Sequence, residues 1–298
     1  MYVCPLCKNE MSKFKCIKCI FAMDGNDQIP TFFSGSSRSN QYKEIADFYD
    51  SVYQVRENAW KDLAGRGEEF ITYVGGLIRS FSPQRHLDIG CGQGYILGAA
   101  SVPEQYGLDL SRKAMEAAKR RSDARLCQGI VEELPYPDNF FDIVTGIGVL
   151  EHFLDLSASM QEIARVLRPG GIFLTLVYVG TPFSERLKVK VGQFLFPRPR
   201  PIEFGRWIVN RFTRADHGSD EFGSIHTQVV QPVQNVFTAG SVERLFSESG
   251  FRIHSLITKR RVPNAPLEGH HFRIYIIEKV GSEVRGEEVA AVKARAQL

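Results

Sequence analysis

Four cysteines near the amino terminus have the spacing of a metal site. Residues 4–7 are Cys-Pro-Leu-Cys and residues 16–19 are Cys-Ile-Lys-Cys, so the chain carries two Cys-x-x-Cys pairs. Each pair forms a tight turn that presents two thiolates to one ion, and two pairs complete the tetrahedral sulfur site that Zn²⁺ prefers. Because protein ligands fill all four positions, the bound ion would be structural rather than catalytic. We predict that Zn²⁺ is held by Cys4, Cys7, Cys16 and Cys19, with a redox pair or unbound thiols as the alternatives.

A glycine-rich turn in residues 87–94, Leu-Asp-Ile-Gly-Cys-Gly-Gln-Gly, has the pattern of a nucleotide-type site. Glycine lets the backbone turn sharply and come close to a ligand, because no Cβ intervenes. Asp109 follows 19 residues after Gly90, where a carboxylate can accept hydrogen bonds from two adjacent ribose hydroxyls. Tyr95 stands where a dinucleotide fingerprint has Gly or Ala, so the turn favours a nucleoside ligand without a pyrophosphate.

The elements that must position these residues are short apolar strands alternating with helices. Such alternation predicts a parallel sheet that is covered by helices on both faces. The predicted strands are residues 85–89, 105–110, 125–129, 141–146, 172–179, 251–259 and 272–280, and the predicted helices are residues 95–100, 111–121, 156–167 and 241–249.

The composition changes along the chain divide it into four parts. Residues 1–34 form a cysteine-rich module whose core is too small to fold without a metal. Residues 35–84 contain a polar linker and two helical stretches that we interpret as lid helices, and residues 85–280 contain the alternating pattern. Residues 181–240 interrupt that pattern as an insertion, and residues 281–298 form a charged tail that we predict to be flexible.

Five motifs in this order resemble those of class I S-adenosylmethionine-dependent methyltransferases of the UbiE-like group. They lie in residues 87–94, 106–111, 132–142, 149–152 and 165–171. The resemblance implies a Rossmann-like, doubly wound sheet of seven mostly parallel strands, with the last strand antiparallel and an α-helical insertion before the last two strands. The cysteine module resembles the zinc ribbons that precede some methyltransferases, including certain ribosomal RNA guanine methyltransferases.

The resemblance also implies which residues hold the S-adenosylmethionine. The turn around Asp88 would surround the methionine part together with Ile147, Asp109 would hold the ribose, and Leu110 would lie against the adenine. The chain departs from the family at Ile130, where an aspartate usually contacts the adenine amine, which leaves Val131 and Glu132 as the contacts there. The predicted cofactor-binding residues are Asp88, Gly90, Cys91, Gly92, Asp109, Leu110, Val131, Glu132 and Ile147.

Methyl transfer from a sulfonium depends mostly on proximity and orientation, so it requires few catalytic side chains. A base is needed only where the acceptor must lose a proton. His152 is the best candidate because it follows the fourth predicted strand, at the edge of the sheet where ligands bind. His226 and Tyr49 are weaker candidates, and the alternative for His152 is a loop histidine that packs or forms hydrogen bonds.

The charge and hydropathy of the chain restrict its partners. A net charge of +3 is too small to indicate a nucleic-acid-binding protein by itself. The longest apolar run, residues 172–179, is far shorter than the roughly 18 residues that span a bilayer. The first residues lack the basic and apolar stretches of an export signal, so we expect a cytoplasmic protein, with peripheral attachment to a membrane left open.

The insertion is expected to choose the methyl acceptor. Residues 181–215 carry eight Lys or Arg and two Glu, together with apolar residues at helical spacing. Such a segment can cover an acceptor pocket, lie on an anionic membrane, or bind RNA phosphates. We predict methyl transfer to an oxygen, nitrogen or carbon of a small or lipophilic metabolite. The alternatives are methylation of an rRNA or tRNA base and a non-catalytic cofactor-binding protein, the latter supported only by Ile130.

Overall fold

The computed structural model describes residues 2–12, 15–19, 21–22, 29–32, 39–55, 67–179, 235–258, 261–262 and 272–281. Most of the 181–240 insertion, His226 and the tail from residue 282 therefore lie outside the described residues. The helices and strands are β1 (Met11–Ser12), β2 (Lys15–Cys16), α1 (Ser39–Val55), α3 (Glu68–Ser80), β3 (Arg85–Ile89), α4 (Tyr95–Ala100), β4 (Glu104–Asp109), α5 (Arg112–Ala118), β5 (Arg125–Gln128), η1 (Val131–Glu133), β6 (Phe141–Ile147), η2 (Leu150–His152), α6 (Leu156–Val166), β7 (Leu167–Tyr178), α9 (Ala239–Glu248), β8 (Phe251–Thr258) and β9 (Phe272–Lys279).

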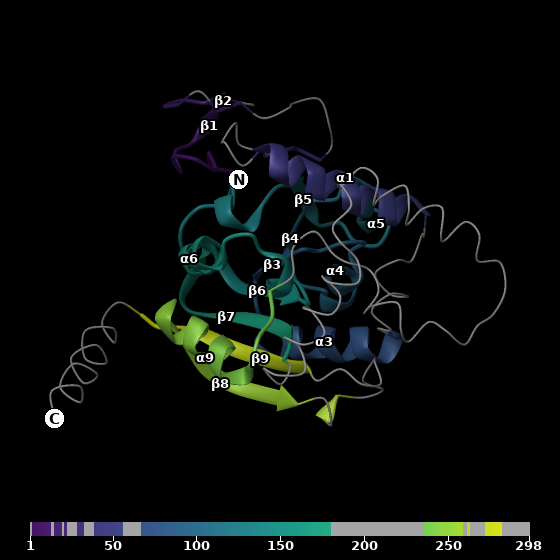
Figure 1. Cartoon of the computed structure of the whole chain (residues 1–298), viewed down its shortest axis with the longest axis vertical. Helices are drawn as coiled ribbons and strands as arrows, with labels where there is room; N and C mark the ends of the chain where they lie inside the picture. Colours follow the sequence, from purple (N-terminus) through teal and green to yellow (C-terminus); the bar gives the residue numbers. More distant parts are fainter. Residues whose placement is uncertain are drawn as a thin grey trace, which may run out of the picture.

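The main sheet has seven strands in the order β5-β4-β3-β6-β7-β9-β8 (Figure 1). The five strands from β5 to β7 are parallel to one another, whereas β9 runs antiparallel to both of its neighbours. The predicted Rossmann-like sheet with an antiparallel last strand is therefore confirmed. Its carboxyl-end edge brings together the residues that follow β3, β4 and β6.

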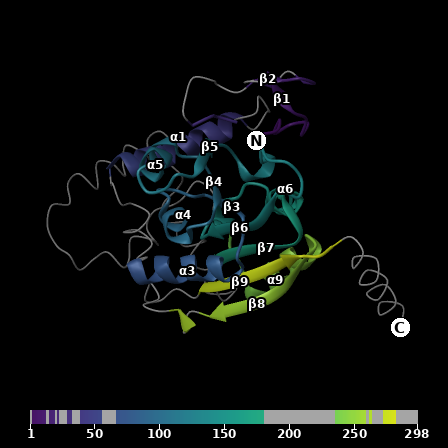
Figure 2. The same ribbon diagram turned by 180° about the vertical axis from the view of Figure 1, so that it is seen from behind.

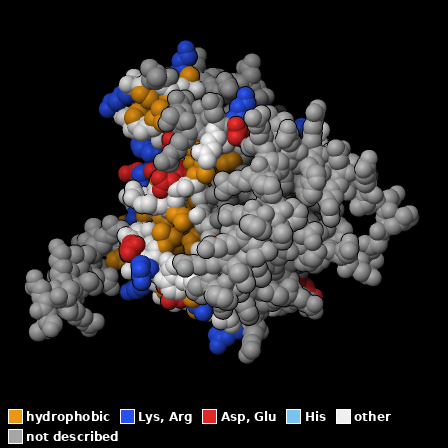
Figure 3. Space-filling view, viewed as in Figure 1, with side chains coloured by type: hydrophobic (Ala, Val, Ile, Leu, Met, Phe, Trp, Pro, Cys, Tyr) orange, Lys and Arg blue, Asp and Glu red, His pale blue; other side chains and the backbone are white. Residues whose placement is uncertain are grey.

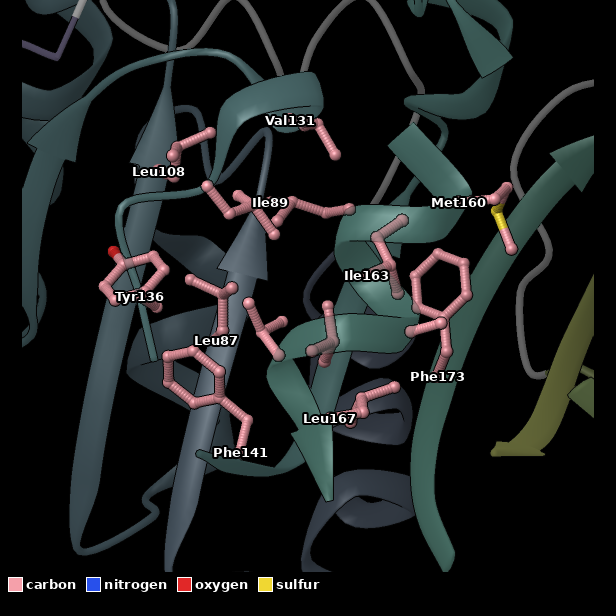
Figure 4. Close-up of a cluster of buried hydrophobic side chains, with 14 of the residues drawn as sticks. Leu87, Ile89, Leu108, Val131, Tyr136, Phe141, Met160, Ile163, Leu167 and Phe173 are labelled. Carbon is pink, nitrogen blue, oxygen red and sulfur yellow. The ribbon is translucent and has the colours of Figure 1, made fainter. Parts of the chain in front are cut away.

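Helices cover both faces of this sheet. On one face α6 and α9 pack on a cluster of large apolar side chains from β3, β4, β6 and β7, part of which Figure 4 shows. On the other face α3, α4 and α5 pack on two further clusters. The central strands are buried on both sides, which explains why their sequences are apolar runs rather than alternating patterns. No helix in the described part of the chain is long and apolar enough to cross a bilayer.

The boundary between α6 and β7 differs from the prediction. The Pro-Gly-Gly sequence at residues 169–171 indicated a loop before a strand at 172, but β7 begins directly after α6, at Leu167. Leu167 pairs with Phe141 of β6, and the register then shifts before Ile172 pairs with Ile143. The glycines permit this irregularity, with Gly170 at φ +73°. The helix ends before the Pro-Gly-Gly sequence as predicted, but this sequence is part of strand β7 rather than a loop.

The cysteine module packs against the β5 end of the sheet, opposite the β8 end (Figures 1 and 2). The Val3 N–H donates to the Pro135 carbonyl at 3.0 Å, and the Tyr2 ring lies 4.9 Å from the Phe32 ring. The Phe32 N–H donates to the carbonyl of Gln128 at 2.7 Å, and the Gln128 N–H donates to the carbonyl of residue 30 at 2.8 Å. A short segment of the module thus extends the sheet beyond β5. The division into domains at residue 34 stays a prediction.

The tips of the two cysteine pairs are not buried against the sheet. Leu6 is 44% exposed and Ile17 is 61% exposed. In Figure 3, hydrophobic side chains are visible at this end of the molecule, beside Lys and Arg side chains. The module therefore combines a packed side with an exposed surface that is partly apolar and partly basic.

Candidate active site

The glycine turn lies between β3 and α4, at the carboxyl-end edge of the sheet. Gly90, Gly92 and Gly94 have φ values of +64°, +49° and +76°, a region that side chains rarely adopt. A Cβ at Gly90 would lie 2.4 Å from Cγ1 of Val149, so the turn also passes too close to η2 for any side chain. These glycines are required by the backbone itself, and the N–H groups of Gly90 and Cys91 both donate to the Leu108 carbonyl, at 2.7 and 3.1 Å, which ties the turn to β4.

Asp109, the last residue of β4, connects the turn to the start of α5. One carboxylate oxygen accepts a hydrogen bond from the Gly92 N–H at 2.7 Å, and the other accepts one from the Ser111 N–H at 2.7 Å. Burial raises the pKa of Asp109 to about 6, although these backbone donors act in the opposite direction. Because a carboxylate can accept about four hydrogen bonds, these backbone donors leave acceptor capacity for the ribose hydroxyls that the sequence predicts here.

The amino-terminal helix α1 is fixed beside Asp109 through Asp50. The Asp50 carboxylate accepts a hydrogen bond from the Ser111 hydroxyl at 2.6 Å and another from the Lys113 N–H at 3.1 Å. The preceding residue, Tyr49, lies close enough to Asp109 and Glu151 that their charges add to burial in raising the pKa of its phenol. The sequence predicted a lid helix here but did not identify Asp50, because its partners are about 60 residues away.

The residues predicted for the methionine part lie on the adjacent strands β3 and β6. Asp88 is buried on β3, opposite Thr145 of β6, and its carboxylate accepts a hydrogen bond from the Thr145 hydroxyl at 2.6 Å. Ile147 is buried at the end of β6, and Cys91 is buried in the turn. The structure therefore brings Asp88, Gly90, Cys91, Gly92, Asp109 and Ile147 to one edge of the sheet.

The residues predicted for the adenine lie around the end of β5. The Gln128 side chain donates to the Leu110 carbonyl at 2.8 Å and accepts from the Thr31 hydroxyl at 3.0 Å, so the cysteine module supports this wall. Val131 is buried at the start of η1. Glu132 already accepts a hydrogen bond from the Asp155 N–H at 3.1 Å, at the start of α6. The role of Glu132 toward adenine stays a prediction.

His152, the predicted base, ends the short helix η2, which follows β6. Its side chain is partly exposed. The preceding Glu151 is buried, and its carboxylate accepts a 2.7 Å hydrogen bond from the N–H of Tyr178 at the end of β7. The Glu151 carbonyl accepts another from the Asn235 N–H at 2.7 Å. Glu151 thus holds η2 against the carboxyl ends of the strands, a role that sequence reasoning missed, whereas the catalytic role of His152 stays a prediction.

The four cysteines of the module meet at one point. Their sulfur atoms all lie within 4.8 Å of one another. Sγ of Cys7 is 3.4 Å from that of Cys16 and 3.7 Å from that of Cys19, and the Sγ atoms of Cys4 and Cys19 are 3.5 Å apart. A tetrahedral ion with metal–sulfur bonds of about 2.3 Å places its ligands about 3.8 Å apart, so the donor set and its size fit Zn²⁺. The Lys18 N–H also donates to Sγ of Cys16 at 3.3 Å.

Comparison with known proteins shows similarity to methyltransferases. Residues 87–175 match a family model described as a methyltransferase domain. The chain is 30% identical to a demethylmenaquinone methyltransferase of Symbiobacterium thermophilum over 227 residues, which covers 70% of this chain and 82% of the relative. It is 32% identical to the 27-O-demethylrifamycin SV methyltransferase of Amycolatopsis mediterranei, over 44% of this chain and 54% of the relative. It is 37% identical to a fatty-acid O-methyltransferase of Mycolicibacterium smegmatis, over 30% of this chain and 36% of the relative.

Solved structures share the fold at low sequence identity. Magnesium protoporphyrin IX methyltransferase of Synechocystis, solved with bound S-adenosylhomocysteine, aligns with a TM-score of 0.51 and 15% identity over 80% of this chain and 99% of that one. A chain of the Haloferax volcanii complex between the Trm112 methyltransferase activator and a methyltransferase aligns with a TM-score of 0.53 and 14% identity, over 80% and 98%.

Proposed function

This chain belongs to the class I S-adenosylmethionine-dependent methyltransferases of the UbiE-like group, and we propose that it methylates an oxygen, nitrogen or carbon atom of a small, lipophilic metabolite. The observation that carries the acceptor class is the nature of the similar relatives, which are named for a quinone precursor, a rifamycin and a fatty acid. We propose that the insertion at residues 181–240 chooses the acceptor.

The arrangement at the sheet edge accounts for how the chain would use its cofactor. When bound, S-adenosylmethionine supplies an electrophilic methyl group on a cationic sulfur. Asp109 would hold the ribose, while Asp88 and Ile147 would fix the methionine end, so that the acceptor meets the methyl group in line. Where the acceptor is a hydroxyl or an amine, His152 would receive its proton.

We also propose that the cysteine cluster holds one structural Zn²⁺. The four thiol sulfurs have the separations of a tetrahedral site, and a module this small gains its stability from metal binding. The measurement is the zinc content of purified protein together with the number of thiols that react with a chromogenic disulfide. About one zinc ion per chain and four unreactive thiols are expected; a metal-free protein with four reactive thiols would contradict the site.

The acceptor class is tested with methyl-labelled S-adenosylmethionine and fractionated cell extract. Label that partitions into the organic phase supports a lipophilic acceptor. Label in RNA would instead support the second candidate, an RNA methyltransferase. The basic insertion and the exposed tips of the cysteine module favour this candidate. Binding of S-adenosylhomocysteine with no label transfer to any fraction would indicate a non-catalytic protein.

The proposed acceptor also bears on where the protein acts. We place it in the cytoplasm, with peripheral attachment to an anionic membrane if the acceptor is a lipid. Co-flotation with vesicles that contain anionic lipid, compared with neutral vesicles, distinguishes the two locations.

A further inference from the structure

A chain of hydrogen bonds runs behind the glycine turn, from a buried histidine to Asp88. Nε2 of His86 lies 2.8 Å from the Thr145 hydroxyl oxygen, which in turn lies 2.6 Å from a carboxylate oxygen of Asp88. All three side chains are almost completely buried. Leu87 and Ile89 of β3 point toward α6 (Figure 4), so the alternating residues His86 and Asp88 face the other side of the sheet, which α3 and α4 cover.

The direction of this chain follows from the chemistry of its members. An ionised carboxylate can only accept hydrogen bonds, so the Thr145 hydroxyl donates to Asp88 and its oxygen accepts from His86. Burial lowers the pKa of His86 to about 3, so the ring is neutral and carries a single N–H. The other nitrogen, Nδ1, is buried and has no hydrogen-bond partner among the described residues. The proton therefore belongs on Nε2, where it is donated to the Thr145 hydroxyl oxygen.

The register of the sheet makes the chain possible. Asp88 pairs directly with Thr145 across β3 and β6, and His86 lies two residues earlier on the same face of β3. Valine and threonine share the β-branched shape and differ only in a methyl group in place of the hydroxyl, so packing alone does not require a hydroxyl at position 145. The hydroxyl and the imidazole together supply Asp88 with a polarised donor in a place that water does not reach.

We propose that His86 and Thr145 are positioning residues for the methyl donor, because they hold the Asp88 carboxylate in one orientation beneath the methionine part of S-adenosylmethionine. This role rests on the proposed function. The methionine part carries an ammonium group and a sulfonium, so a fixed negative charge beside it favours binding. Neither residue touches the reacting atoms, and both act through Asp88 alone.

The test compares matched variants by calorimetric titration with S-adenosylmethionine. Thr145→Val removes the donor and should raise the Kd about tenfold, since a hydrogen bond to a charged group is lost. Thr145→Ser keeps the hydroxyl and should stay close to the wild-type Kd. His86→Leu removes only the polarisation and should raise the Kd about threefold, whereas His86→Gln, whose amide can replace the Nε2 donor, should restore it.

Thr175→Val is the control for a merely structural effect. Thr175 is a buried threonine on the neighbouring strand β7, and its hydroxyl donates to the Gly146 carbonyl at 2.7 Å. The Thr175→Val variant should lower the melting temperature without changing the Kd for S-adenosylmethionine. A Thr145→Val variant that binds like the wild type, or a Thr145→Ser variant as weak as Thr145→Val, would overturn the role.

Nitrogen-15 NMR of the imidazole gives a second readout that does not depend on binding. A proton on Nε2 of His86 is expected, and a proton on Nδ1 would contradict the direction of the chain. Failure of the wild-type protein to bind S-adenosylmethionine or S-adenosylhomocysteine would overturn the proposed function, and this role with it. Normal wild-type binding with an unchanged Thr145→Val variant would overturn this role alone.

Discussion

Asp109 should make the affinity for the cofactor depend on pH in a window set by its surroundings. Burial raises the pKa of this carboxyl to about 6 in the free protein. Ribose hydroxyls donate to the ionised form and favour it, so binding lowers the pKa and releases a proton. Affinity should therefore be complete above about pH 7 and should fall as the pH drops through 6, because Asp109 is then protonated before the ligand arrives.

The size of the effect follows from the fraction of protein that is competent to bind. With a pKa of about 6, roughly nine-tenths of the Asp109 carboxyls are ionised at pH 7 and roughly one-tenth at pH 5. Since the apparent Kd is the intrinsic Kd divided by that fraction, it should rise about tenfold between pH 7 and pH 5. Near pH 6 about half a proton should be released for each ligand bound.

The assay is calorimetric titration with S-adenosylhomocysteine at pH 5, 6 and 7, in buffers of different ionisation enthalpy. The Asp109→Asn variant should bind at least tenfold more weakly, with little dependence on pH. Its amide NH₂ must also face one of the two backbone N–H groups that donate to the carboxylate, so that one of these two hydrogen bonds is lost. Asp123→Asn, the same change at an exposed position, should behave like the wild type. A flat pH profile in the wild type, or a tenfold dependence that persists in Asp109→Asn, would refute the reasoning.

Three further changes test the turn and the cysteine module. Cys7→Ser should lower the zinc content below one ion per chain and lower the melting temperature, as measured by atomic absorption and by calorimetry. Gly90→Ala should reduce the free energy of unfolding by about 1–3 kcal/mol, because its φ is +64° and its Cβ would meet a valine, whereas Gly67→Ala meets nothing within 4 Å; equal denaturant midpoints for the two would contradict this. Glu162→Gln should cost about 1–2 kcal/mol because its carboxylate accepts a 2.7 Å hydrogen bond from Lys8, and a double-mutant cycle with Lys8→Met should give a nonzero coupling energy.

Much of the fold could be predicted because its signals are local. Apolar runs of strand length, separated by helical patterns, indicated the doubly wound sheet, and the strand ends were correct to within about two residues except at β7. The glycine turn was predictable for the same reason, because positive φ values at three closely spaced positions require glycine wherever the rest of the chain lies. The predicted ribose carboxylate, Asp109, follows from the length of one strand–helix–strand unit.

The parts of the site that sequence reasoning missed are contacts across strands and between distant segments. Asp50 accepts a hydrogen bond from Ser111, which lies 61 residues away in the sequence, and Asp88 accepts one from Thr145, which lies 57 residues away. Nothing in the spacing of these residues marks them, because register and packing decide which side chains meet. Residues 29–32 likewise show no pattern that would pair them with β5.

The sequence by itself therefore predicted the sheet, the glycine turn and the four cysteines of the metal site, since each depends on residue types at short, regular separations. The methyl donor followed from the resemblance of five ordered motifs to those of methyltransferases. Only the tertiary structure decided that His86 stands behind Asp88, that α1 is held beside Asp109, and that the cysteine module supports the wall at Leu110. The physical reason is the same in each case. A hydrogen bond needs its partners within about 3 Å, and that distance is set by the packing of the whole domain rather than by separation along the chain.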